Sequence, residues 1–229
     1  MLGIIGAMDV EVNELCSCLE IKEVTEIAEI KFNVGTIFGK DIVIAKCSEG
    51  KVNAAVAAHI MCLKYHADKI INTGVAGGLL PEMNICDIVV ATASVQHDYD
   101  ITPLGYEKGK IPNIDTITFP CEKTMTDTLY NIASKIEGIT AYKGVVASGD
   151  QFINSNDKMT DIKNTFGALC AEMEGGAIGQ VCHLNKTSYC ILRAMSDKAD
   201  NNSNIDFPTF VETACKNTVT ILKEYIKTL

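Results

Sequence analysis

Runs of apolar and β-branched residues alternate with helical patterns along the whole chain, and this alternation constrains the fold more than any other feature. Several runs are apolar at nearly every position, which is typical of strands covered by helices on both faces. The pattern therefore predicts an α/β fold, a three-layer α/β/α sandwich around a mixed central β-sheet. We expect strands at residues 2–6, 31–37, 41–45, 69–72, 87–95, 143–147 and 188–193.

Helices are expected between and after these strands. Segment 52–65 is alanine-rich and apolar on most sides, so it predicts a buried helix. For the last helix we expect Asp206 as the cap and Pro208 in the first turn, which places its start near Phe207. No repeat or linker interrupts the chain, so residues 1–229 are expected to form a single domain. The expected helices span 10–19, 52–65, 123–135, 157–165, 175–183 and 207–227.

Charge and cysteine content restrict the possible partners and the compartment. The formal net charge is -9, and an acidic surface repels phosphate backbones and anionic lipid headgroups. We therefore expect no nucleic-acid or membrane partner. The ten cysteines include no CxxC pair, and the sequence has neither a signal peptide nor a long apolar span. These features predict a cytoplasmic protein without a metal site.

Polar residues follow the expected strands at four places, and α/β folds gather their active sites at the carboxyl ends of strands. Glu11 comes after strand 2–6, and the small residues of segment 72–78, including Ala76 and Gly77, let a backbone approach a ligand closely. An acidic first helical turn and a simple tight turn are the structural alternatives for these two segments.

The other two polar segments lie in the last third of the chain. Glu172 and Glu174 are two residues apart in apolar sequence, where burial is costly unless each carboxylate is hydrogen-bonded. Arg193 and Asp197 belong to the last strand and its end. For Glu172 and Glu174 the structural alternative is a solvated helix start, and for Arg193 and Asp197 it is an Arg–Glu ion pair. Taken together, the four segments supply acids, one arginine and a glycine-rich wall, which suits general acid–base chemistry on a sugar.

These segments resemble the 5′-methylthioadenosine/S-adenosylhomocysteine nucleosidases of the nucleoside phosphorylase superfamily. The order SGDQFIN, AEMEGGAI and RAMSDKAD is highly specific, and nearly the whole chain takes part. The other matching segments are IIGAMDVEV, GKVNAA, INTGVAGGL, CDIVVA and HDYDITPLGYEKGKIP. The resemblance implies a nucleoside phosphorylase-like fold and no cofactor. It also implies hydrolysis of the N-glycosidic bond of 5′-methylthioadenosine and S-adenosylhomocysteine, with 5′-deoxyadenosine or adenosine as further candidates, to adenine and a 5-thioribose derivative.

The resemblance also implies roles for individual residues. Asp197, held by Ser196, is the expected acid for purine N7, and Glu11 is the expected base for water, with Arg193 nearby. Glu174 is expected to grip the ribose hydroxyls. The other expected substrate-binding residues are Ala76, Gly77, Glu172, Met173 under the ribose, Phe152 and Ile153 at the purine, and Met8, Ile101 and Phe207 at the alkylthio group. Tyr106 and Pro112 are expected to reach the pocket of a partner subunit, which implies a homodimer.

Glu49 departs from the family pattern. It stands where the family usually has an isoleucine that lines the alkylthio pocket. A charged group against a thiomethyl is unfavourable, so we expect Glu49 either to favour a polar 5′ substituent or to turn into solvent.

Two other functions compete with hydrolysis. A phosphorylase would transfer the ribose to phosphate, and its dianion site would need arginines, of which Arg193 is the only one in the chain. A non-catalytic nucleoside sensor would not need the acids at 11, 174 and 197.

Overall fold

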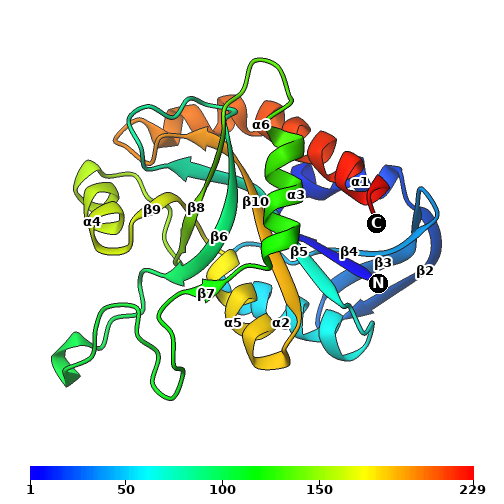
Figure 1. Ribbon diagram of the computed structural model, residues 1–229, viewed down its shortest axis with the longest axis horizontal. Coiled ribbons are helices and arrows are strands. Elements are labelled where there is room, and N and C mark those ends of the chain that lie inside the picture. The colour runs from blue at the N-terminus through cyan, green and yellow to red at the C-terminus, as the bar shows by residue number, and fades with distance from the viewer.

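The computed structural model describes residues 1–229 and has one large mixed β-sheet (Figure 1). The strands follow one another across the sheet in the order β10-β6-β8-β9-β5-β1-β4-β3-β2, and β7 pairs with β6. Their bounds are β1 Leu2–Gly6, β2 Glu20–Ile27, β3 Ile30–Ile37, β4 Lys40–Lys46, β5 Lys69–Gly78, β6 Ile88–Gln96, β7 Phe119–Pro120, β8 Ala141–Ser148, β9 Ala168–Glu172 and β10 Ser188–Asp197.

The sheet curls on itself at β5. This strand pairs with β1 through its first residues, Lys69–Asn72, and with β9 through Gly77 and Gly78 at its end. It also pairs with β10 along most of its length, so β5, β10, β6, β8 and β9 close into a ring. Glycines in a strand allow such bends because they carry no side chain to pack. The ring brings the carboxyl ends of β5 and β10 together.

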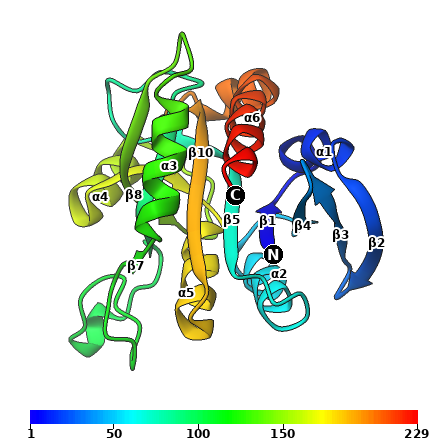
Figure 2. The ribbon, with the colours of Figure 1, turned by 45° about the vertical axis from the view of Figure 1, so that its right-hand side comes forward.

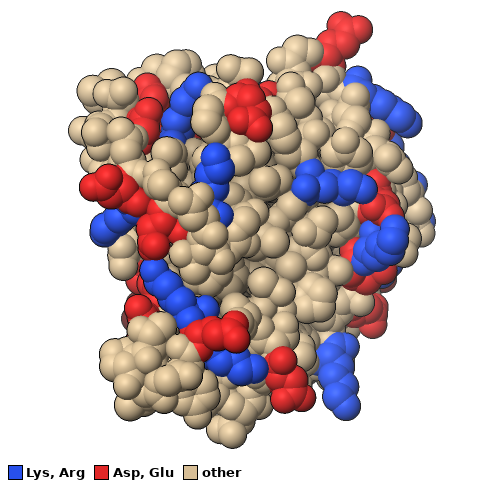
Figure 3. All heavy atoms as spheres, turned by 60° about the vertical axis from the view of Figure 1, so that its left-hand side comes forward, with Lys and Arg blue, Asp and Glu red and all other residues tan.

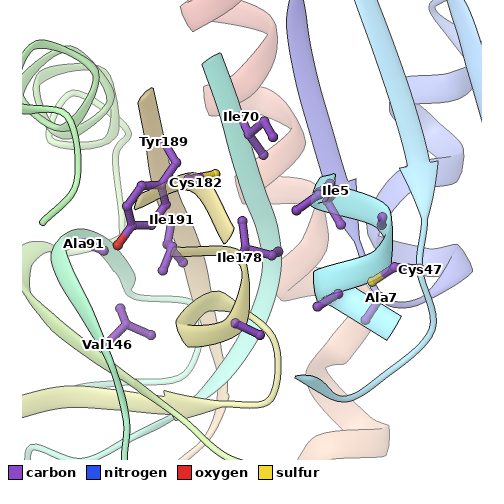
Figure 4. Close-up of a cluster of buried hydrophobic side chains, with 14 of the residues drawn as sticks. Ile5, Ala7, Cys47, Ile70, Ala91, Val146, Ile178, Cys182, Tyr189 and Ile191 are labelled. Carbon is purple, nitrogen blue, oxygen red and sulfur yellow. The ribbon is translucent and has the colours of Figure 1, made fainter. Parts of the chain in front are cut away.

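Helices cover both faces of the sheet (Figure 2). The helices α2 and α5 pack on one face, where Ile5, Ile70, Ile178 and Ile191 fill the space between them and the strands (Figure 4). The helices α1, α3 and α6 bury the opposite face. The bounds are α1 Asp9–Ser17, α2 Lys51–Leu63, α3 Lys123–Ala133, α4 Asn156–Phe166, α5 Gly175–Asn185 and α6 Ser203–Lys227, and a short 3₁₀ helix, η1, spans Thr102–Leu104.

All the strands and helices expected from the sequence are present. The structure differs in the bounds of some of them and in having strands that were not expected. The predicted start of the last helix near residue 207 is wrong: α6 begins at Ser203, so Asp206 lies inside its first turn and Pro208 lies in its interior. The chain turns into α6 earlier because Ser203 N donates to Asp200 O and Ile205 N to Asn202 O. The short strands β7 and β9 and the exposed edge strand β2 were not expected.

The surface carries charges of both signs. On the face drawn in Figure 3, basic and acidic side chains lie beside one another around the rim, and the centre of the face is uncharged. None of the helices combines the length and the apolar character that crossing a lipid bilayer requires.

Candidate active site

A cavity of about 350 Å³ opens where β1, β5, β9 and β10 end. Its volume is within the range of small-molecule sites, roughly 300–1,000 Å³. Five acids and one arginine line it, together with ten apolar residues and no lysine. Fourteen of the residues predicted from the sequence belong to this lining: Met8, Glu11, Glu49, Ala76, Gly77, Phe152, Ile153, Glu172, Met173, Glu174, Arg193, Ser196, Asp197 and Phe207.

Glu11 is fixed at the start of α1 with its carboxylate fully buried. Glu11 Oε2 accepts from Ala7 N at 2.7 Å and from Met8 N at 2.9 Å, and Oε1 accepts from Val75 N at 3.0 Å. Burial raises the pKa of Glu11, although Arg193 and these backbone N–H groups act in the opposite direction. Glu11 is therefore more than an acidic first turn, because it joins α1 to β5 beneath the cavity.

Arg193 lies between the acids. Its Nη2 pairs with Glu172 and lies 3.2 Å from Glu174 Oε2, while Nη1 lies 3.9 Å from Glu11 Oε1. Only 1% of its side chain is exposed, so a lone charge there would be very costly. The Arg–Glu ion pair considered from the sequence is thus present, and it forms part of the cavity wall.

The two acids after β9 differ in their surroundings. Glu172 accepts from Gly175 N at 2.8 Å and from Ser148 Oγ in addition to Arg193, so its carboxylate is committed to protein partners. Glu174 accepts only from Gly50 N, at 2.9 Å, and from Arg193. Burial, opposed by Arg193 and assisted by Glu172, raises the pKa of Glu174 to about 7. Glu174 therefore has more free capacity to accept hydrogen bonds from a ligand.

Asp197 is the last residue of β10 and lines the cavity. Its Oδ2 accepts from Ser196 Oγ at 2.9 Å, and its Oδ1 accepts from Ala199 N at 2.9 Å. Burial raises the pKa of Asp197, against the effect of these hydrogen bonds. A carboxyl group whose pKa is raised in a cavity is suited to donating a proton.

Phe152 and Phe207 form an aromatic wall. Their rings meet edge to face, with centroids 5.8 Å apart and planes at 85°. Phe152 is 47% exposed and lines the cavity, so its ring is accessible to a flat ligand.

Three predicted residues do not line the cavity of the single chain: Ile101, Tyr106 and Pro112. They lie in the segment around η1, between β6 and β7, which extends away from the body of the protein (Figure 1). Tyr106 is 43% exposed.

Three further residues hold the site; they lie in segments quoted from the sequence, but no role was predicted for them. Asn72 Oδ1 accepts from Arg193 Nη2 at 2.5 Å, and Ser148 binds Glu172. Gly74 has φ +155°, and a Cβ there would lie 2.1 Å from Glu11 Oε1. These roles could have been predicted from polar residues and glycines inside apolar strands. A buried strand contains such residues where a polar group needs a hydrogen-bond partner or where another chain segment or a ligand comes close to the backbone.

The comparisons with known proteins agree with this geometry. The family model described as "Phosphorylase superfamily" matches residues 1–227. The 5′-methylthioadenosine/S-adenosylhomocysteine nucleosidase of Geobacillus sp. is 36% identical over the full chain and 98% of its own length. The chain belongs to this nucleosidase family of the phosphorylase superfamily.

Solved nucleosidase structures have the same fold. The enzyme from Neisseria meningitidis, in complex with methylthio-immucillin-A, superposes with a TM-score of 0.95 at 34% identity, covering 100% of this chain and 99% of that one. A futalosine hydrolase of Helicobacter pylori also matches, with a TM-score of 0.94 at 30% identity over 100% and 97%. The nucleoside phosphorylase-like α/β fold expected from the sequence is therefore confirmed, and the matching structures carry names for more than one substrate.

Proposed function

We propose that this protein hydrolyses the N-glycosidic bond of 5′-methylthioadenosine and S-adenosylhomocysteine and releases adenine. The observation that carries the proposal is that Glu11, Glu174 and Asp197 line one nucleoside-sized cavity together with the aromatic pair Phe152 and Phe207. Membership of the nucleosidase family supports the choice of substrates.

In the proposed reaction Asp197 donates a proton to purine N7. The bond between the purine and C1′ then breaks, and its electron pair leaves with the neutral base. Without that proton adenine would depart as an anion, which is a poor leaving group. The raised pKa of Asp197 supports this role, because more of the acid stays protonated near neutral pH.

Glu174 and Glu11 act on the sugar and on water. Positive charge grows on the ribose as the bond breaks, and a carboxylate that accepts from its hydroxyls stabilises that charge. Glu174 is assigned this role because a peptide N–H and Arg193 are its only protein partners. Glu11 orients a water molecule and takes its proton as the water oxygen bonds to C1′.

Electrostatics favours water over phosphate as the nucleophile. The cavity lining holds five acids against the only arginine of the chain, and that arginine is already paired with Glu172 and Glu174. A phosphate dianion would be repelled by the acids and would find no free guanidinium. The alternative function, a purine nucleoside phosphorylase, is therefore the weaker proposal.

A homodimer is proposed as the working assembly. Val52, Leu63 and Leu184 expose apolar side chains on α2 and α5, which pack side by side, and Leu104 is 74% exposed on η1. Contiguous exposed apolar surface is typical of protein interfaces. Tyr106 and Pro112 are assigned to the partner's cavity, as the resemblance implies, and the segment that carries them extends away from the body of the protein. Ile101, expected at the alkylthio group, lies in the same segment and outside the cavity of its own chain.

The test is adenine release from 5′-methylthioadenosine and S-adenosylhomocysteine with and without phosphate. We expect the same rate in both conditions and a free thioribose product. Release that requires phosphate and gives a sugar 1-phosphate would favour the phosphorylase. No release in either condition would favour the non-catalytic sensor considered from the sequence.

A further inference from the structure

Glu49 is held at the cavity by its neighbours on both sides. It lies in the turn between β4 and α2. Before it, Cys47 N donates to Gly6 O at 2.9 Å, at the start of the turn that leads to Glu11. After it, Gly50 N donates to Glu174 Oε1 at 2.9 Å. The turn is therefore tied to the site at both ends, and Glu49 belongs to the cavity lining.

The charge of Glu49 has no partner within the protein. The two nearest lysines along the chain are engaged elsewhere: Lys46 Nζ lies 2.9 Å from Asp9 Oδ2, and Lys51 Nζ lies 2.7 Å from Asp98 Oδ1. Only the backbone oxygen of Glu49 is used, as an acceptor from Asn53 Nδ2 at 2.8 Å. The residue is exposed, so water can solvate its carboxylate when no ligand is bound.

The turn lies beside the ribose rather than beside the purine. In the proposed function Asp197 takes the purine and Glu174 takes the ribose hydroxyls, and Gly50, the residue after Glu49, is bonded to Glu174. Glu49 lines the same cavity as Met8 and Phe207, which are assigned to the alkylthio group, so its carboxylate is assigned to the part of the ligand that continues beyond the sugar. In a nucleoside that part is the 5′ substituent.

We propose that Glu49 selects nucleosides by the charge of the 5′ substituent, favouring tails that end in an ammonium group and disfavouring tails that end in a carboxylate. This inference rests on the proposed function. An ammonium group gains an ion pair with Glu49, a neutral alkylthio tail gains nothing from the charge, and a carboxylate is repelled. The homocysteine tail carries an ammonium and a carboxylate on one carbon, so its net charge is zero and the test uses tails that carry one charge each.

The experiment compares three adenosine thioethers of similar length, with 5′-propylthio, 5′-aminoethylthio and 5′-carboxymethylthio groups. The kcat/KM of each is measured for the wild type and for Glu49→Gln, which keeps the shape of the side chain and removes its charge. We expect the ammonium-to-propyl ratio of kcat/KM to fall about 2- to 5-fold in Glu49→Gln, the size of an exposed ion pair. The carboxylate-to-propyl ratio should rise by a similar factor, and high salt should weaken both changes.

Glu137→Gln is the matched control, because it removes the same charge from an exposed residue outside the cavity. Its ratios should equal those of the wild type. Ratios that are the same in Glu49→Gln and in the wild type, while the propylthio nucleoside still releases adenine, would overturn the inference and leave the proposed function intact. Absence of adenine from all three compounds would overturn both.

Discussion

Replacing Asp197 by asparagine removes the proposed proton donor and little else. Both carboxyl oxygens of Asp197 are used, one with Ser196 Oγ and one with Ala199 N, each at 2.9 Å. An asparagine keeps the second hydrogen bond through its oxygen and the first through its NH₂ group, because a serine hydroxyl can also accept. Burial raises the pKa of Asp197 and so disfavours its charged form, which means that a neutral amide is tolerated there.

The expected loss is therefore confined to the chemical step. A positioned general acid contributes about 10²–10⁴ to a rate, which corresponds to roughly 2.7–5.5 kcal/mol of barrier. We expect kcat for adenine release by Asp197→Asn to fall by that factor. The dissociation constant of a non-hydrolysable 5′-methylthioadenosine analogue, measured by calorimetry, should change by less than about 5-fold, and Tm should not fall.

Ser196→Ala provides a comparison for this experiment. It removes one hydrogen bond to Asp197 but leaves the acid in place, so its kcat should fall less than that of Asp197→Asn. An Asp197→Asn enzyme that releases adenine within about 5-fold of the wild-type rate would refute the assignment of the acid. A loss of kcat/KM in Asp197→Asn that is explained entirely by weaker binding of the nucleoside would refute it too.

Three further predictions concern the site and the exposed apolar residues of α2 and α5. The profile of kcat/KM against pH should be bell-shaped, because Glu11 must be deprotonated as the base and Glu174 charged on the ribose, whereas Asp197 must be protonated as the acid. Burial raises all three pKa values, that of Glu174 to about 7, so both limbs should lie above the ordinary carboxyl range. A profile that is flat from pH 4 to 9 would contradict these roles. Gly74→Ala places a Cβ 2.1 Å from Glu11 Oε1. We expect about 1–3 kcal/mol of destabilisation in chemical denaturation and a kcat/KM more than 10-fold lower. Gly39 also has a positive φ, but a Cβ there would meet no atom within 4 Å, so the kcat/KM of Gly39→Ala should stay at the wild-type value. Leu184→Glu puts a charge on the exposed α2–α5 face, so light scattering should show a monomer with lower activity, whereas an unchanged mass and activity would remove that face as the dimer interface.

The sequence predicted those parts of the fold where apolar periodicity is strong. The strands β1, β5 and β10 were expected because each contains a short apolar run, and nearly every position of these strands is buried. By contrast β2, with the sequence EIKEVTEI, has no buried face and therefore no apolar alternation to detect. The pairing of β5 with both β1 and β10 depends on contacts between distant segments, which local patterns do not encode.

The residues of the site that belong to a recognisable motif were predicted from the sequence. Residues that only position another side chain were not. Glu11, Glu174 and Asp197 were named from the sequence, and all three line one cavity. Asn72 lies in the segment 72–78 named from the sequence, but its role was not predicted, because its contact with Arg193 joins residues 121 positions apart in the chain.

The central claim is that Glu11, Glu174 and Asp197 surround one bound adenine nucleoside. A crystal structure with a non-hydrolysable 5′-methylthioadenosine analogue tests it most directly. We predict Asp197 within hydrogen-bonding distance of the purine N7 position, Glu174 on the ribose hydroxyls, and a water molecule between Glu11 and C1′. An analogue that binds elsewhere, or with its purine facing away from Asp197, would contradict the account.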